Sequence, residues 1–429
     1  MAALEEHIIG LSEGIDLDSY VIATYLLQGP AEEDMLSRAA AIAVEQTVGR
    51  GVFKMKGMEY LMETRGGRLL SLIPIPDHES RTSKEEGEWQ VHMARVAFPV
   101  ENTGFQIPMM LTTILSDVSM SGMLKLVDLD LPKRFLDAFQ GPKIGLKGVR
   151  DFFETDRPLI CSILKPCVGV DAKTAANIFY QHAIGGADVI KDDELMAYGG
   201  DYKMVDRVRL CMEMEKRVFE ETGEHKMYLV SITNRPDRML EDARRAIEAG
   251  ANGLMLTPLT TGISAIQMLS EAPDINVPVF AHPGMLGSMS WSPDFGISEH
   301  ILIGKLVRIA GADINAIPVP YGRFTHLREK FIKLFKISKA PMGHIKPMFT
   351  QTGGGINPIN SMEVMKDIGN DVMLVAGGSI QEHPMGLSSG LKAMRQSIQA
   401  YMDKVPLEEA SRQNKELGFA WQMYGPKKG

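Results

Sequence analysis

Short apolar runs alternate with amphipathic stretches along the chain from Pro158 onward. The apolar runs are rich in Val, Ile and Leu and end in polar or glycine residues, which is typical of buried strands that open into loops. The stretches between them have helical periodicity, and one begins after Asn234-Arg235-Pro236 and stops at Gly250, as helix signals require. The eight runs are PLICSILKP, ADVIKDDE, KMYLVSITN, GLMLTPL, VPVFAHP, DINAIPVP, HIKPMFTQTGG and VMLVAGGS. Repeats of roughly thirty residues, each a strand then a helix, predict an α/β fold with a (β/α)₈ barrel.

The chain before this repeat has a different pattern. SYVIATYLL and EWQVHMARVAFPV look like strands, and EEDMLSRAAAIAVEQT looks like a helix. We therefore predict a smaller α+β domain over residues 1–142, followed by the barrel over 143–429 with a helical C-terminal tail. The Gly-Pro pair of FQGPKIG, residues 139–145, marks the junction.

The amino-acid composition of the chain argues against some classes of binding partner. The 429 residues are 45% apolar and carry a formal net charge of −8, which offers no basic field for nucleic acid or an anionic membrane surface. No stretch approaches the roughly eighteen uncharged apolar residues of a membrane span, and the N-terminus lacks a basic leader region. We expect a cytoplasmic protein that acts on a small molecule.

The three cysteines, Cys161, Cys167 and Cys211, are sparse and have no ligand spacing. This argues against a disulfide framework or a structural zinc site and favours a reducing compartment.

The run ADVIKDDE ends in four charged residues, Lys191 to Glu194. Such a run is usually a solvated surface segment. Here it closes a strand at the barrel face that carries active sites, and strand alternation turns at least one charge inward. Asp193 and Glu194 supply the hard oxygen ligands that Mg²⁺ prefers. Lys191 would repel the cation unless its neutral amine took up CO₂, since the resulting carbamate is a third oxygen ligand.

GGADVIKDDE resembles the metal-binding segment of ribulose-bisphosphate carboxylase, in which the lysine is carbamylated. The resemblance implies a carbamate on Lys191 that binds Mg²⁺ together with Asp193 and Glu194. Further matches are FQGPKIG, SILKP, TQTGGG, VAGGS and EHPMG. The family also implies a homodimer in which the N-terminal domain of one subunit covers the barrel mouth of the other, with active sites at the interface.

Departures from the carboxylases fall at residues that bind CO₂ and phosphate. Lys165-Pro166-Cys167 keeps the first lysine of a Lys-Pro-Lys motif and loses the second, and His282-Pro283 replaces a His-Arg pair that holds one phosphate. The loop VPYGRF leaves only Arg323 where the carboxylases have a lysine that grips CO₂. These changes argue against carboxylation and predict a substrate with one phosphate.

The N-terminal domain shows a similar mixture. Glu45 matches a family site residue, but the Thr-Trp pair that follows it in carboxylases is Arg50-Gly51 here. Asp117 stands where the family has an asparagine that reaches the metal region from the partner subunit.

The remaining candidate residues each have a structural alternative. TGGG and AGGS match the family's phosphate cradle, with backbone N–H donors at Gly354, Gly355, Gly377 and Gly378, although glycine pairs also form tight turns. Lys165 is expected to act as the proton shuttle, with a pKa lowered by burial. The alternative is a lysine that extends into solvent from the end of a strand. His282 is a candidate for ligand binding or proton transfer, or else a packed histidine. Asn234 orients substrate or caps the next helix. Cys167 is expected to be a packing residue.

The retained residues predict removal of a proton next to a metal-bound carbonyl. The first hypothesis is a Mg²⁺-dependent isomerase of a phosphorylated ketose, such as a 5-methylthioribulose 1-phosphate-type intermediate of sulfur and methionine salvage. A diketo-phosphate enolase and a decarboxylase of a phosphorylated branched 3-oxo sugar acid remain open alternatives. A non-catalytic regulatory or assembly relic is the alternative of another class, and CO₂-dependent Mg²⁺ binding would exclude it.

Overall fold

The computed structural model describes residues 8–75, 89–196, 203–324 and 326–426. The chain divides into two compact units. The first comprises Met1–Phe139, Met285–Leu302 and Met342–His344, and the second comprises Gln140–Gly284, Ile303–Pro341 and Ile345–Gly429. The first unit includes two segments from later in the chain, whereas the predicted division is a single boundary near residue 142. The predicted domain boundary therefore stays a prediction.

The first unit contains a mixed sheet with the strand order β10-β4-β1-β3-β2. Its strands are β1 (Tyr20–Pro30), β2 (Arg68–Ile75), β3 (Trp89–Pro99), β4 (Met123–Asp130) and β10 (Gly296–Ile297), and its helices are α2 (Met35–Glu45), α3 (Tyr60–Arg65), α4 (Ile107–Leu115), α5 (Lys133–Leu136) and α12 (Leu286–Ser290). The Asp34 carboxylate caps α2 by accepting from the amides of Leu36 and Ser37. The predicted strands at β1 and β3 and the predicted helix at α2 are confirmed.

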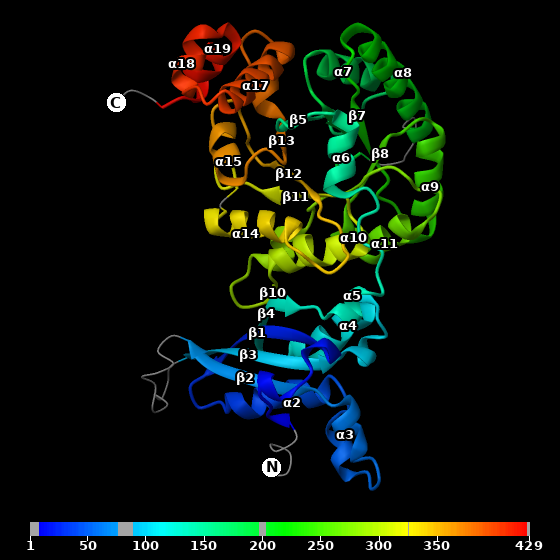
Figure 1. Cartoon of the computed structure of the whole chain (residues 1–429), viewed down its shortest axis with the longest axis vertical. Helices are drawn as coiled ribbons and strands as arrows, with labels where there is room; N and C mark the ends of the chain where they lie inside the picture. Colours follow the sequence, from blue (N-terminus) through cyan, green and yellow to red (C-terminus); the bar gives the residue numbers. More distant parts are fainter. Residues whose placement is uncertain (1–7, 76–88, 197–202, 325, 427–429) are drawn as a thin grey trace. The chain divides into compact units, whose positions relative to one another are not determined.

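The second unit is built on a closed barrel, in which β11, β12, β13, β5, β6, β7, β8 and β9 are neighbours in that order (Figure 1). All the neighbouring pairs are parallel. The strands are β5 (Leu159–Ile163), β6 (Val189–Lys191), β7 (Met227–Ser231), β8 (Gly253–Leu256), β9 (Val279–Ala281), β11 (Ile314–Pro318), β12 (Phe349–Gly353) and β13 (Val372–Ala376). Each of the eight predicted runs contains one of these strands, so the predicted barrel is confirmed.

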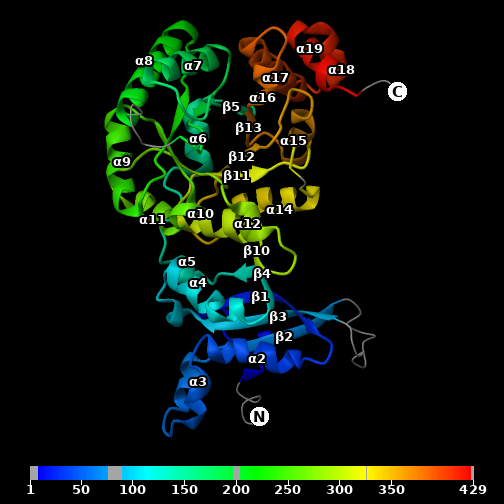
Figure 2. The ribbon, with the colours of Figure 1, turned by 180° about the vertical axis from the view of Figure 1, so that it is seen from behind.

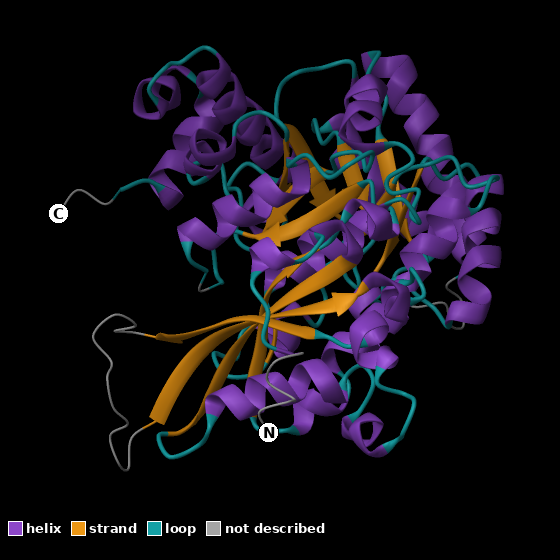
Figure 3. Cartoon of the chain, turned by 60° about the horizontal axis from the view of Figure 1, so that its bottom comes forward, coloured by secondary structure: helices purple, strands orange, loops and turns teal. Residues whose placement is uncertain are grey.

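Helices surround the barrel strands, as Figure 3 shows by colour. Helices α7, α8 and α9 lie on one side of the barrel and α15 and α17 on the opposite side (Figures 1 and 2). The helices are α6 (Gly145–Phe153), α7 (Ala172–Ile184), α8 (Met204–Thr222), α9 (Pro236–Glu248), α10 (Pro258–Thr261), α11 (Ser264–Glu271), α13 (Val307–Ala310), α14 (Arg328–Lys339), α15 (Ser361–Ile368), α16 (Gly378–Gln381), α17 (Leu387–Met402), α18 (Leu407–Gln413) and α19 (Lys415–Tyr424). Within the described residues, no helix has both the length and the apolar composition that a membrane span requires.

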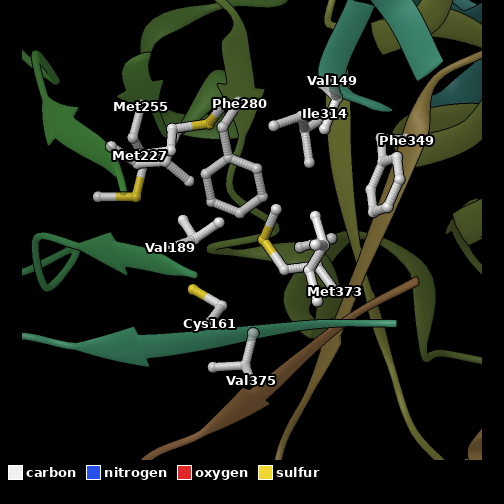
Figure 4. Close-up of a cluster of buried hydrophobic side chains, with 13 residues drawn as sticks. Val149, Cys161, Val189, Met227, Met255, Phe280, Ile314, Phe349, Met373 and Val375 are labelled. Carbon is white, nitrogen blue, oxygen red and sulfur yellow. The ribbon is translucent and has the colours of Figure 1, made fainter. Parts of the chain in front are cut away.

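The barrel interior is filled by apolar side chains from its strands (Figure 4). Val189, Met255 and Phe280 belong to this core and have no exposed surface, and Val149 of α6 packs against the same cluster. A filled interior is expected for eight strands, because a barrel of this size leaves room only for side chains. The chemistry must therefore lie at the rim of the barrel.

Candidate active site

The predicted site residues of the barrel unit lie at the carboxyl ends of the strands. Because the strands of the closed barrel are parallel, these ends share one rim. Lys191 is the last residue of β6, and the others follow their strands: Lys165 after β5, Asn234 after β7, His282 after β9, Arg323 after β11, Gly354 and Gly355 after β12, and Gly377 and Gly378 after β13. The fold thus gathers residues that are far apart in the sequence.

Charged groups form a chain of contacts on this rim. Lys165 Nζ lies 2.5 Å from Asp193 Oδ2, and Lys191 Nζ lies 3.4 Å from Glu194 Oε2. His282 Nε2 lies 3.5 Å from the same Glu194 oxygen. Lys191 is 2% exposed and Asp193 is 1% exposed, whereas the Glu194 side chain is 38% exposed, so the alternative of a solvated charge run is wrong except for the last residue of the run.

Alternation along β6 separates the roles of the neighbouring charges. Lys191 Nζ approaches Met255 Sδ of the barrel core at 3.9 Å. Asp192 is fully buried and accepts hydrogen bonds from Arg207 Nη2 of α8 at 2.8 Å and from the Tyr228 hydroxyl at 2.6 Å. Lys191 therefore faces the barrel core, whereas Asp192 holds β6 to the helical layer. Sequence reasoning assigned no role to Asp192, since alternation predicts that a charge turns inward but not which partner meets it.

The pKa of Lys165 differs from the prediction. Burial by itself lowers this pKa, but hydrogen bonds to Asp193 and Cys167 outweigh burial and hold the pKa above its ordinary 10.5. Burial likewise raises the pKa of Asp193, whereas the hydrogen bonds from Lys165 and from the Leu195 amide bring it below its ordinary value. The predicted lowered pKa of Lys165 is therefore wrong for this arrangement, because each group stabilises the charged form of the other.

His282 is a neutral imidazole at pH 7. Burial, followed by the positive charge of Lys191, lowers its pKa to about 4. Its Nδ1 atom is buried and has no hydrogen-bond partner among the residues that the structure describes. A buried nitrogen without a partner is costly, so this atom fits a site that is completed by a ligand.

Lys191 at the end of β6 and the two carboxylates that follow it fit a hard divalent cation if Lys191 is modified. In the described part of the chain, no group of three or more His, Cys, Asp and Glu side chains is arranged to hold a metal ion. Asp193 and Glu194 provide two carboxylates, and Lys191 lies beside Glu194. A carbamate on Lys191 would supply the third oxygen ligand that Mg²⁺ needs here. The site and the carbamate stay predictions.

Backbone conformation and packing account for one of the two predicted glycine pairs and not for the other. Gly354 and Gly355 have positive φ angles of 107° and 104°, and a Cβ atom on Gly354 would lie 2.3 Å from the Phe324 ring. Backbone conformation and close packing thus explain this pair. Around Gly377 and Gly378 a Cβ atom would meet nothing nearer than 3.5 Å. Packing does not explain that second pair, and its phosphate role stays a prediction.

Asn234 and Arg323 have distinct surroundings. Asn234 Nδ2 donates to Asp242 Oδ2 of α9 at 2.8 Å, and its Oδ1 accepts from the Arg235 amide at 2.8 Å. Both polar atoms of this side chain are engaged, but α9 has Arg235 at its N-cap and no side-chain cap hydrogen bond, so the predicted capping role is wrong and the substrate role stays a prediction. Arg323 is exposed, and its guanidinium carbon lies 4.9 Å from the centre of the Phe324 ring.

Glu45 and Asp117 lie together within the first unit. Both line one cleft of about 550 Å³, which Arg65 and Asn102 also line. The Glu45 carboxylate pairs with Arg50 Nε at 2.5 Å. The arginine that departs from the family's Thr-Trp pair therefore contacts the retained glutamate. Sequence reasoning missed Arg65 and Asn102, which come from separate segments and carry no motif.

This chain matches one family model and is similar to known proteins over most of its length. Residues 145–424 match the family model described as ribulose bisphosphate carboxylase large chain, catalytic domain. A ribulose bisphosphate carboxylase-like protein of Archaeoglobus fulgidus is 37% identical over 393 residues, covering 91% of this chain and 90% of the relative. A 2,3-diketo-5-methylthiopentyl-1-phosphate enolase of Bacillus licheniformis is 34% identical over 409 residues, covering 95% of this chain and 98% of the relative.

Solved structures agree with these relatives. A rubisco-like protein, MtnW, from Alicyclobacillus acidocaldarius has a TM-score of 0.87 at 32% identity, covering 95% of this chain and 100% of that chain. A dimeric archaeal Rubisco from Hyperthermus butylicus has a TM-score of 0.86 at 25% identity, covering 98% of this chain and 99% of that chain.

Proposed function

We propose that this chain, which belongs to the ribulose bisphosphate carboxylase large-chain family, is a non-carboxylating enzyme that enolises a phosphorylated ketone. The observation that carries the proposal is the group of charges at the end of β6, where the buried Lys191 approaches Glu194 and the buried Asp193 pairs with Lys165. Buried charges are costly unless they are paired or bind a ligand. Their position on the active rim of a barrel favours catalysis over a non-catalytic relic.

The proposed substrate is 2,3-diketo-5-methylthiopentyl 1-phosphate, an intermediate of methionine salvage. The support for this substrate is the sequence similarity to the 2,3-diketo-5-methylthiopentyl-1-phosphate enolase of Bacillus licheniformis, which is 34% identical over 95% of this chain. The predicted isomerisation of a 5-methylthioribulose 1-phosphate-type ketose and the predicted decarboxylation of a 3-oxo sugar acid would pass through the same kind of enediolate. These reactions stay predictions, and substrates for them belong in the same assay.

Lys191, as a carbamate, would hold Mg²⁺ together with Asp193 and Glu194. When bound there, the cation would polarise the substrate carbonyl as a Lewis acid. Lys165 carries a proton at neutral pH while it contacts Asp193, because its pKa is raised. It is therefore poised to donate a hydrogen bond or a proton to the developing enolate oxygen, and its use as a base requires that the contact with Asp193 be lost.

The uncharged His282 is the second candidate for proton transfer. Burial is the main cause of its lowered pKa and keeps the imidazole neutral at pH 7, so the Nδ1 atom, which has no partner among the described residues, can take part in a hydrogen bond with substrate. Gly377 and Gly378 leave space at the strand end for backbone N–H groups to approach a phosphate. Gly354 and Gly355 are the other proposed phosphate donors, and Arg323, whose backbone amide bonds to Gly354, is the proposed cation beside them.

The proposed assembly is a homodimer with active sites at the subunit interface. Its support is the family resemblance, together with the dimeric Rubisco of Hyperthermus butylicus. Glu45 and Asp117 are the residues that the N-terminal domain would contribute. Analytical ultracentrifugation at several protein concentrations tests the assembly, and a monomer throughout would contradict it.

The test of function is a proton NMR time course in D₂O with Mg²⁺ and bicarbonate. The diketo, ketose and 3-oxo acid phosphates are supplied separately, and the proposal expects deuterium incorporation and turnover with the diketo phosphate. If only the ketose phosphate or the 3-oxo acid phosphate is turned over, the diketo phosphate is refuted as the substrate, but the proposed enolisation chemistry still holds.

Two lysine variants separate metal binding from proton transfer. Lys165→Ala should lose turnover but keep CO₂-dependent metal binding, which is measured with Mn²⁺ by electron paramagnetic resonance. Lys191→Ala should lose both, because it removes the proposed carbamate. Activity that survived in Lys191→Ala would rule out the carbamate. A wild type that neither binds metal nor exchanges deuterium would be a non-catalytic relic.

A further inference from the structure

The loops that follow β11 and β12 are interlocked. We call residues 319–324 the β11 loop and residues 353–357 the glycine loop. The Arg323 amide donates to the Gly354 carbonyl oxygen at 2.7 Å. A Cβ atom on Gly322 would lie 1.9 Å from that same oxygen, and a Cβ atom on Gly355 would lie 2.8 Å from the Arg323 nitrogen. The two backbones are therefore in direct contact, with no room for a side chain at Gly322 or Gly355.

One side chain bonds to both loops. Asn360 Nδ2 donates to the Tyr321 carbonyl oxygen of the β11 loop at 2.9 Å and to the Gly355 carbonyl oxygen of the glycine loop at 2.9 Å. Its Oδ1 accepts from the Asn357 amide at 2.8 Å, which fixes the orientation of the side-chain amide. Both hydrogens and the oxygen of this group are therefore used at the junction.

A second contact anchors the β11 loop from its other side. The Tyr321 hydroxyl donates to Asp367 Oδ2 of α15 at 2.5 Å. Arg328, at the start of α14, also bonds to Asp367 and donates from Nε to the Tyr321 hydroxyl at 3.2 Å. The β11 loop is thus held through its backbone by Asn360 and through its side chain by Asp367.

This wall presents an unpaired cation. Arg323 stacks on Phe324, and within the described residues no carboxylate oxygen lies within 4.0 Å of its guanidinium. The Phe324 ring itself lies against Gly354, so the guanidinium that stacks on it lies near a loop that follows a barrel strand. An unpaired arginine on a fixed backbone suits a phosphate monoester, which accepts several charge-assisted hydrogen bonds.

We propose that Asn360 is a positioning residue that holds the β11 loop and the glycine loop together as one fixed wall for the substrate phosphate. In this arrangement the β11 loop is a wall of the site and does not act as a lid that opens for each turnover. The phosphate part of the inference rests on the proposed function, whereas the fixed wall rests only on the contacts of Asn360.

Hydrogen exchange tests the wall without any substrate. In Asn360→Asp the carboxylate cannot donate and faces two carbonyl oxygens, so amide exchange in residues 319–324 and 353–357 should accelerate by at least roughly tenfold. Asn252→Asp is the matched control. Asn252 bridges the Lys226 carbonyl and the Tyr228 amide before β8, at the opposite end of the barrel, and its replacement should leave the wall unchanged. Wild-type loops that exchange as fast as an unfolded peptide would overturn the inference.

Phosphate affinity tests the positioning role. Asn360→Asp should raise KM for the phosphorylated substrate and weaken inorganic phosphate binding, measured by calorimetry, by roughly tenfold, with kcat changed less than about threefold. The Asn252→Asp control should keep the wild-type KM. Faster exchange with unchanged KM and phosphate affinity would refute the positioning role. If the wild-type protein binds no inorganic phosphate, both the proposed function and the positioning role of Asn360 are contradicted. The hydrogen-exchange result then still tests whether Asn360 holds the two loops together.

Discussion

Replacing Asp192 with asparagine should destabilise the barrel unit strongly. The carboxylate is fully buried and accepts hydrogen bonds from Arg207 Nη2, from the Tyr228 hydroxyl and from the Ser231 amide, at 2.8, 2.6 and 2.9 Å. Asparagine keeps the shape but leaves the Arg207 guanidinium, whose side chain is 4% exposed, without its counter-charge. Breaking a buried ion pair in this way costs about 3 to 5 kcal/mol.

A second variant distinguishes the lost pair from lost packing. The double variant Asp192→Asn with Arg207→Met removes both charges, so it should recover most of the stability that the single variant loses. Asp274→Asn is the control, because the Asp274–Arg244 pair is about half exposed on both sides. Removal of that pair should cost less than about 1 kcal/mol.

Urea unfolding followed by tryptophan fluorescence measures the effect. Trp89 and Trp291 belong to the first unit, so a background with both changed to Phe leaves Trp421 of α19 as the reporter of the barrel unit. The reasoning is refuted if Asp192→Asn loses less than about 1 kcal/mol, or if the double variant is no more stable than the single variant.

Further predictions concern pH and thiol chemistry. Burial lowers the pKa of His182 to about 4 from its ordinary 6.5, so its stabilising contribution is complete above pH 6.5 and falls as the pH drops towards 4, by about 3 kcal/mol in all. Urea midpoints between pH 7 and 4 should therefore decline in the wild type and flatten in His182→Gln, and equal slopes would contradict the assignment. Cys161 and Cys211 are fully buried with pKa values raised to about 12 by burial, whereas Cys167 is half-buried. A disulfide reagent should thus label one thiol per native chain, that of Cys167. This labelling should abolish turnover, because the Cys167 sulfur lies 2.9 Å from Lys165 Nζ. Rapid reaction of two thiols would disprove the prediction.

The barrel was predictable because its signal is local. Each strand is buried on both faces, so its sequence is a continuous apolar run, and the sequence of each following helix has helical periodicity. The sheet of the first unit was predicted less completely. Sequence reasoning did not identify β2, which contains Pro74, or β4, or β10, which has two residues and joins β4 from far along the chain. Such pairing between distant segments leaves no periodicity in either segment.

The candidate site divides in the same way. The positions of Lys191, Asp193 and Glu194 at a strand end, and of Lys165 on the same rim, could be predicted because the order of strands and loops follows the chain. The pairing of Lys165 with Asp193 and the bridge that Asn360 makes between two loops could not be predicted and became visible only in the folded chain. The pKa of a lysine depends on its distance from a carboxylate of another loop, and a bridging amide depends on where two backbones meet. Those distances arise only when the barrel closes.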